Sequence, residues 1–269
     1  MPEPIDFFVH IPKTAGTTMV QIMEGQYSPG SGLWMRGTAE EDRSAIVANI
    51  EPEKRAMAGH LHYGYARLLP RPCRAFTMLR EPVDRLISLY YFIAREKSMP
   101  THERLLRGEL TMEKLARRQG SVQARFIAGY GPKDVVPPDD ILLAEAKDNL
   151  ATKMAAVGLT EHFDESLLLY NQALGWSVRG YYRENVTRNR LKKEGLSQEE
   201  IEMIRSNSAV DLALYEFARH LFAARIAAQP PEFAQQLAAL RRKIKISHGA
   251  SRVRVGWQLV QRALRLAKT

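Results

Sequence analysis

The chain has little cysteine, no long apolar run and no low-complexity segment. Only Cys73 among its 269 residues is a cysteine, which excludes an internal disulfide and favours a reducing compartment. No stretch approaches the roughly twenty apolar residues of a membrane-spanning helix. The first apolar strand begins near residue 5, so we expect no leader or anchor before it and a cytoplasmic location.

Acidic residues are missing from the end of the chain. Residues 233–269 contain nine Lys/Arg and no Asp/Glu, whereas residues 1–232 balance 30 basic against 30 acidic residues. The formal net charge of +9 therefore resides in the tail, and the neutral body argues against a nucleic-acid binder. We expect one large globular domain over residues 1–232 and a basic, amphipathic C-terminal extension over residues 233–269.

The end of this extension has apolar residues at helical spacing. Three interpretations remain open: peripheral binding to an anionic membrane surface, recruitment of a polyanionic partner such as an acidic glycan, or a terminal helix packed on the body. The apolar positions are Val255, Leu259, Val260, Ala263, Leu264 and Ala267.

Residues 7–18 are the most informative segment of the chain. An apolar strand is followed there by a short loop and the start of a helix. The unpaired N–H groups and the dipole of a helix N-terminus attract anions. Gly16 allows close approach of a ligand, and Lys13 adds a positive charge. The loop therefore predicts a site for a phosphate-like group. It differs from the nucleotide P-loop, since Lys13 precedes the only glycine. The predicted binding residues are Lys13, Thr14, Ala15, Gly16, Thr17 and Thr18.

Two further strands are expected to end in polar residues. A buried strand over residues 75–79 leads into Arg80 and then a helix with Pro82 in its first turn and Ser88 two turns along. Another strand is expected to end at residue 59, and His60 follows it directly. His60 is the candidate proton acceptor, and His62 is the alternative. Carboxyl ends of parallel strands share one sheet edge, so these groups should gather near Lys13. A neutral imidazole is suited to accept a proton near pH 7.

These motifs resemble the sulfotransferases that use 3′-phosphoadenosine 5′-phosphosulfate (PAPS) as donor. The resemblance implies that the loop holds the 5′-phosphosulfate, that Lys13 contacts the leaving-group oxygen, and that Arg80 and Ser88 bind the 3′-phosphate. The segment around His60 resembles heparan sulfate 2-O-sulfotransferase-like and other carbohydrate enzymes, in which the matching histidine is the proposed base. Other sulfotransferases use a glutamate, so an acidic base also stays open.

The resemblance extends from about residue 5 to residue 222. It implies that a polar loop containing Arg183 and Asn185 closes over the donor, although a solvated connector is an equal interpretation. It also implies a carbohydrate or glycolipid hydroxyl as acceptor, with loops near residues 30–37 and 99–108 shaping the acceptor pocket. Golgi members carry an N-terminal membrane anchor. This chain departs from them and resembles soluble bacterial-type members.

Strands and helices alternate along the first half of the chain, which predicts an α/β fold. We expect a P-loop NTPase-like architecture, with a mostly parallel central sheet flanked by helices and a helix-rich C-terminal half. Ser197 and Glu200 are spaced as a capping box and predict a helix start.

The sequence therefore predicts a metal-independent, PAPS-dependent sulfotransferase with His60 as base and Lys13 at the leaving group. The isolated His60-x-His62 pair has no ligand cluster beside it, so no metal site is expected. Two alternatives from other classes remain: a P-loop kinase acting on a small metabolite, and a non-catalytic binder of nucleotides or anionic lipid.

Overall fold

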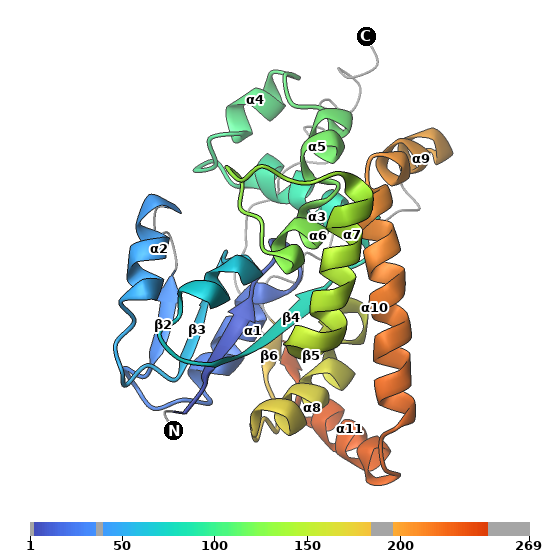
Figure 1. The fold of residues 1–269 in the computed structure, drawn as a ribbon. Coiled ribbons are helices and arrows are strands. Elements are labelled where there is room, and N and C mark those ends of the chain that lie inside the picture. The colour runs from blue at the N-terminus through green and yellow to red at the C-terminus, as the bar shows by residue number, and fades with distance from the viewer. Residues whose placement is uncertain (1–2, 36–39, 184–195, 247–269) are drawn as a thin grey trace.

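The computed structural model describes residues 3–35, 40–183 and 196–246. Its centre is a five-stranded parallel sheet with the spatial order β2-β3-β1-β4-β5 (Figure 1). The strands are β1 (Ile5–Val9), β2 (Gly32–Met35), β3 (Ala56–Gly59), β4 (Cys73–Leu79) and β5 (Met154–Leu159). β1 and β3 are buried along their whole length, because helices cover both faces of the sheet. The predicted α/β fold with flanking helices is confirmed.

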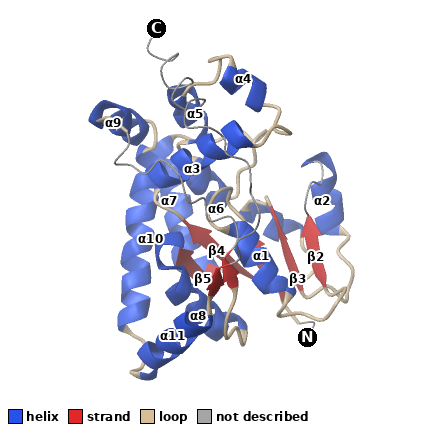
Figure 2. Cartoon of the chain, turned by 180° about the vertical axis from the view of Figure 1, so that it is seen from behind, coloured by secondary structure: helices blue, strands red, loops and turns tan. Residues whose placement is uncertain are grey.

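The two faces are covered by different helices (Figures 1 and 2). Helices α1 (Gly16–Glu24) and α8 (Phe163–Leu174) lie on one face, while η1 (Tyr63–Leu68), α6 (Val122–Ala128), α7 (Asp139–Asp148) and α10 (Ala209–Ala227) lie on the other. Right-handed crossovers produce this division, since the chain moves across the sheet one way from β1 to β2 and the opposite way from β3 to β5. Aromatic rings fill the centre, with Phe8 stacked on Phe76 at 5.1 Å and Trp176 edge-on to Phe76.

A second hydrophobic cluster lies beyond the carboxyl end of β4. It is built by α3 (Pro82–Arg95), α4 (His102–Leu106), α5 (Met112–Gln119) and α9 (Gln198–Ser206) (Figure 1). The capping box predicted for α9 is confirmed, because Ser197 Oγ accepts the Glu200 N–H and the Glu200 carboxylate accepts the Ser197 N–H. The cluster places a helical layer above the edge at which the sequence predicts the site.

Two segments expected to be loops contain regular structure. β2, within residues 30–37, pairs with β3 from Gly32 opposite Ala56 to Met35 opposite Gly59. Residues 99–108 contain α4, anchored by buried His102 and Leu105. Both elements are too short for hydrophobic periodicity to mark them, and tertiary pairing decides their structure. The remaining short elements are α2 (Glu40–Ala48), a π-helical turn (Asn149–Lys153) and η3 (Thr160–His162).

The first part of the predicted extension packs on the body. α11 (Glu232–Lys243) buries Phe233 and Leu240, and its Arg241 pairs with Asp164 and Glu165 of α8. A two-stranded parallel pair, β6 (Tyr182–Arg183) with β7 (Lys245–Ile246), follows. Residues 247–269 lie outside the described residues, and the division at residue 233 stays a prediction. None of the helices in the described part of the chain combines the length and apolarity needed to cross a bilayer.

Candidate functional site

The loop between β1 and α1 holds an unusual backbone shape. Lys13 and Ala15 have positive φ angles of 72° and 63°, which side chains other than glycine rarely adopt. Buried Thr14 stabilises this shape by donating from Oγ1 to the Ile11 carbonyl at 2.9 Å. Such strained residues persist only where the surrounding structure holds them, and they concentrate at ligand sites.

The loop ends at the N-terminus of α1. The first backbone bond of this helix runs from Met19 N to Ala15 O at 3.2 Å, so the N–H groups of residues 16–18 precede it and have no acceptor within the helix. The first turn carries no acidic residue. Thr17 is exposed and Thr18 is buried. A helix start of this composition attracts an anion.

Gly16 is required by its neighbour rather than by its backbone angles. A Cβ atom at this position would lie 1.6 Å from His10 Nε2, well inside contact distance. The imidazole of His10 therefore occupies the space beside the first residue of α1. Any larger residue at position 16 would displace either this ring or the start of the helix.

Arg80, the first residue after β4, joins the second motif to this loop. Its guanidinium Nη1 donates to the Lys13 carbonyl at 3.1 Å. Its backbone is held by buried Gln123 of α6, whose side-chain amide accepts the Arg80 N–H at 2.9 Å and donates to the Arg80 carbonyl at 2.8 Å. The two segments that the sequence links only by order, 67 residues apart, are thus in direct contact.

Buried Asp211 supports this arrangement from α10. Its carboxylate accepts the N–H groups of Gln123 and Ala124, at 3.1 and 2.8 Å, and so caps the N-terminus of α6. Burial raises the pKa of Asp211 to about 6, against the attraction of Arg85 and these two donors. The cap fixes the helix whose Gln123 holds Arg80.

Ser88 lies on the less buried side of α3. Glu81 caps this helix by accepting the Asp84 N–H at 2.8 Å, and Pro82 occupies its first turn as predicted. Ser88 is half-buried, one helical turn before Phe92. The ammonium of Lys13 sits 4.0 Å from the centre of the Phe92 ring. Ser88 is therefore on the helical face that the β1–α1 loop contacts.

His60 follows β3 and lies beside the loop. Its Nδ1 is 3.3 Å from the His10 carbonyl, and the two imidazole centres are 4.4 Å apart. Arg43 of α2 donates from Nη1 to the His60 carbonyl at 3.0 Å. Desolvation lowers the pKa of His60, the positive charges of Arg43 and Lys13 lower it further, and the contact with the His10 carbonyl opposes them. The imidazole is consequently neutral near pH 7 and able to accept a proton.

His62 points to other neighbours than His60. The chain turns after β3, with the Leu61 N–H bonded to the Gly59 carbonyl, so the strand does not continue through both histidines. The ring of His62 lies 4.5 Å from that of Tyr65 and close to Gly131. Desolvation lowers its pKa, and Asp134 opposes that shift. Only His60 is placed against His10 and the loop.

An acidic group also lies at this edge, beyond β5. Glu161 accepts the Glu81 N–H at 3.0 Å and the hydroxyl of Tyr215 at 2.8 Å. Both carboxylate oxygens are therefore engaged in holding α3 and α10. In the described residues no group of three or more His, Cys, Asp or Glu is arranged to hold a metal ion.

The predicted closing loop is only partly described. Of Arg183 the structure describes the backbone, paired in β6 with Ile246, while Asn185 lies outside the described residues. Their predicted contact with a donor stays a prediction.

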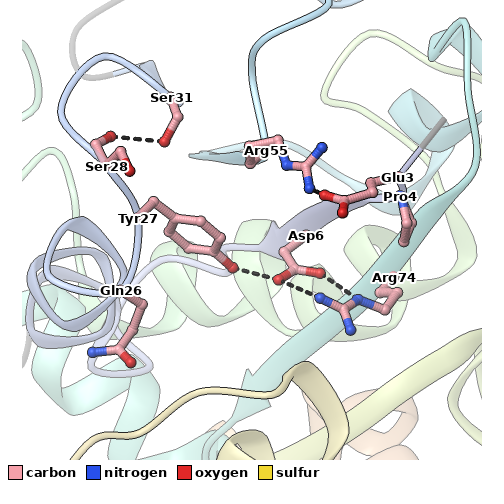
Figure 3. Close-up of a pocket in the computed structure, with 9 residues that line it drawn as sticks. All are labelled: Glu3, Pro4, Asp6, Gln26, Tyr27, Ser28, Ser31, Arg55 and Arg74. Carbon is pink, nitrogen blue, oxygen red and sulfur yellow. Dashed lines mark hydrogen bonds and ion pairs between the residues drawn. The ribbon is translucent and has the colours of Figure 1, made fainter.

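A separate cavity of about 540 Å³ lies at the amino ends of the strands (Figure 3). Asp6 of β1 forms its centre and accepts hydrogen bonds from Tyr27 and from Arg74 of β4. Because the strands are parallel, this cavity is at the opposite end of the sheet from Lys13, His60 and Arg80. It contains none of the predicted site residues.

Two residues of the site are missing from the sequence-based prediction. His10 occupies the same position after β1 that His60 occupies after β3, since Val9 pairs with Gly59. That shared position after two apolar strands is a signal present in the sequence. Gln123 has no such signal, because it lies inside a short helix and its role depends on how α6 packs against β4.

Comparison with known proteins matches part of the chain to a family model. Residues 7–130 match the profile of the sulfotransferase family. A crystal structure of mouse sulfotransferase SULT7A1 complexed with PAP is similar at 14% identity and a TM-score of 0.40, over 79% of this chain and 66% of that one. This chain thus spans slightly less than two thirds of that structure. No curated protein sequence matches the chain. The matched residues include the β1–α1 loop, His60 and Arg80, so the part of the chain that resembles the sulfotransferase family is the part that carries the predicted site.

Proposed function

We propose that this protein transfers a sulfuryl group from PAPS to a hydroxyl of a carbohydrate or glycolipid. The observation that carries the proposal is the contact of the Arg80 guanidinium with the Lys13 carbonyl, with His60 across the neighbouring strand. Three strands thereby bring an anion loop, a permanent cation and a neutral imidazole to one sheet edge. These are the groups that the reaction requires.

In this proposal the donor is held at two points. Lys13, Thr14, Ala15, Gly16, Thr17 and Thr18 bind the 5′-phosphosulfate through helix N–H groups, hydroxyls and the lysine charge. Arg80 and Ser88 bind the 3′-phosphate, for which an arginine fork is well matched. Arg183 and Asn185 remain candidates for closing over the bound donor.

His60 and Lys13 have different roles in the transfer step. Nε2 of His60 takes the proton of the acceptor hydroxyl while its oxygen attacks the sulfur atom. The bond from sulfur to the bridging phosphate oxygen breaks, and its electron pair leaves with adenosine 3′,5′-bisphosphate. Lys13 neutralises the charge that develops on this oxygen. Rate enhancement comes from positioning and preorganised charge.

The carbohydrate acceptor and the location are finer proposals. The acceptor follows from the resemblance of the His60 segment to the 2-O-sulfotransferase-like branch. We also propose a cytoplasmic protein whose basic tail contacts an anionic membrane surface, drawing on the charge of residues 247–269. Deleting these residues should reduce binding to anionic vesicles and leave donor binding intact. Unchanged vesicle binding would remove the membrane proposal.

Calorimetric titration of the whole chain with adenosine 3′,5′-bisphosphate, beside ATP with magnesium, tests the function. Tight binding of the bisphosphate, weakened by Arg80→Ala, is expected. A preference for ATP would instead support a P-loop kinase. Bisphosphate binding without transfer to any hydroxyl in an acceptor screen would support a non-catalytic binder.

A further inference from the structure

His10 and His60 form a pair of imidazoles at the carboxyl edge of the sheet. Val9 of β1 pairs with Gly59 of β3 in the last register position, so the next residues along both strands are the two histidines. Their ring centres are 4.4 Å apart with a tilt of 35°. Residues 50 positions apart in the chain are thus packed ring to ring beside the β1–α1 loop.

The ring of His10 is held on three sides. It stacks on buried Phe8 at 5.4 Å with an angle of 13° between the planes. Its Nε2 edge lies against Gly16, at the space where any other residue would carry a Cβ atom. Its third neighbour is the imidazole of His60. The ring therefore bridges the first residue of α1 and the histidine that follows β3.

The main chain of His10 also acts on His60. The His60 Nδ1 atom is 3.3 Å from the His10 carbonyl oxygen. A carbonyl oxygen can only accept, so this contact is a hydrogen bond when Nδ1 carries the proton. In a neutral imidazole the lone pair is then on Nε2, the atom that remains to take a proton.

We propose that His10 is a positioning residue for the base: its carbonyl selects the Nδ1–H tautomer of His60, and its ring fixes the His60 ring against the loop that binds the donor. This inference rests on the proposed function, in which His60 accepts the proton. Gly16 contributes to this positioning, because the absence of a side chain there leaves room for the His10 ring.

The charges around His60 disfavour its protonated form. Lys13 faces His60 from the β1–α1 loop and Arg43 faces it from α2, and both disfavour a proton on its ring. Near pH 7 His60 is consequently held in the neutral state that can accept the acceptor's proton.

Long-range ¹H–¹⁵N NMR of the histidine rings in the whole chain tests the proposal without any acceptor. In the unaltered protein we expect a neutral His60 with its proton on Nδ1. Both His10→Ala and His10→Phe keep the main-chain carbonyl, so they test the ring that holds His60 against it. Without the ring, His10→Ala should convert His60 to a mixture of tautomers, while His10→Phe, which restores a ring, should retain the Nδ1–H form. His220→Ala, on the exposed surface of α10, is the matched control and should leave His60 unchanged.

A proton on Nε2 in the unaltered protein would overturn the proposal, and so would a His60 spectrum unaffected by His10→Ala. If His10→Ala does not fold, the tautomer of the unaltered protein still decides. Titration with adenosine 3′,5′-bisphosphate tests the proposed function separately from the pairing of His10 with His60. The dissociation constant of His10→Phe for this nucleotide should stay within about threefold of that of the unaltered protein. Failure of the unaltered protein to bind the nucleotide would reject the proposed function but not the histidine pairing.

Discussion

The two ends of the parallel sheet differ in how their charged groups are arranged. At the amino end, Asp6 is buried and accepts hydrogen bonds from Tyr27 and Arg74, which in turn contact Trp176 and the Leu174 carbonyl (Figure 3). Burial and then Asp6 raise the pKa of Tyr27, so its hydroxyl stays protonated as a donor. Each charge there has an opposite charge beside it.

At the carboxyl end, positive charge and strained backbone accumulate instead. Lys13 and Arg43 both lower the pKa of His60, and the N-terminus of α1 lies beside the neighbouring His10. The charges that line the amino-end cavity are thus paired with one another, whereas the carboxyl end holds the groups to which we assign the donor.

The largest effect should come from Lys13→Ala. In the proposed reaction Lys13 stabilises the departing phosphate oxygen, so turnover should fall by roughly 10²–10⁴ or more, with a smaller change in bisphosphate affinity. The measurement is the rate of bisphosphate release from PAPS with a carbohydrate acceptor found by screening. A loss confined to donor affinity would contradict the role at the leaving group.

His60→Ala should cost a comparable factor of about 10²–10⁴ in turnover, because the proton acceptor is removed. The lowered pKa of His60 places the acid limb of the rate profile below pH 6.5, since activity is lost only when the neutral ring gains a proton. His62→Ala is the matched control, and its ring faces Tyr65 rather than the loop. Normal turnover of His60→Ala would exclude it as the base.

Arg80→Ala tests the donor site by binding alone. Hydrogen bonds to a charged group contribute about 1.5–3 kcal/mol, so the bisphosphate should bind roughly 10–150-fold more weakly. Calorimetry at fixed ionic strength measures this. Arg80→Lys should recover only part of the affinity, because an ammonium lacks the planar fork. Unchanged affinity would remove Arg80 from the site.

The contrast between the two ends was partly visible in the sequence. The strand ends at Lys13, His60 and Arg80 were predicted because each follows an apolar run and parallel strands share one carboxyl edge. The amino-end cluster was not, since Asp6 and Arg74 meet only through the pairing of β1 with β4. Gln123 was missed for the same reason: its contact with Arg80 is set by tertiary packing, which leaves no local pattern.

Asp6→Ala should damage the fold and spare the site. It leaves Tyr27 and Arg74 without their acceptor, and the loss should be about 1–3 kcal/mol of unfolding free energy. The half-exposed Arg74 regains water, which keeps the loss below that of a fully buried ion pair. Urea unfolding measures the effect. The affinity of the folded fraction for the bisphosphate should stay within about twofold of that of the unaltered protein. A larger loss would show that the two ends of the sheet are energetically coupled.

Arg55→Ala should have the smallest effect and is the charge-matched control for Arg80→Ala. Arg55 lines the amino-end cavity and pairs with Glu3, and both side chains are substantially exposed. Exposed pairs contribute about 0–1 kcal/mol, so stability should hardly change. Both variants remove one positive charge, so the net charge of the protein changes equally. If the bisphosphate distinguishes them, as we expect, binding depends on where the charge lies rather than on the total. Equal weakening by both would mean that the carboxyl edge attracts the anion only through net charge, and the contrast between the two ends would fail.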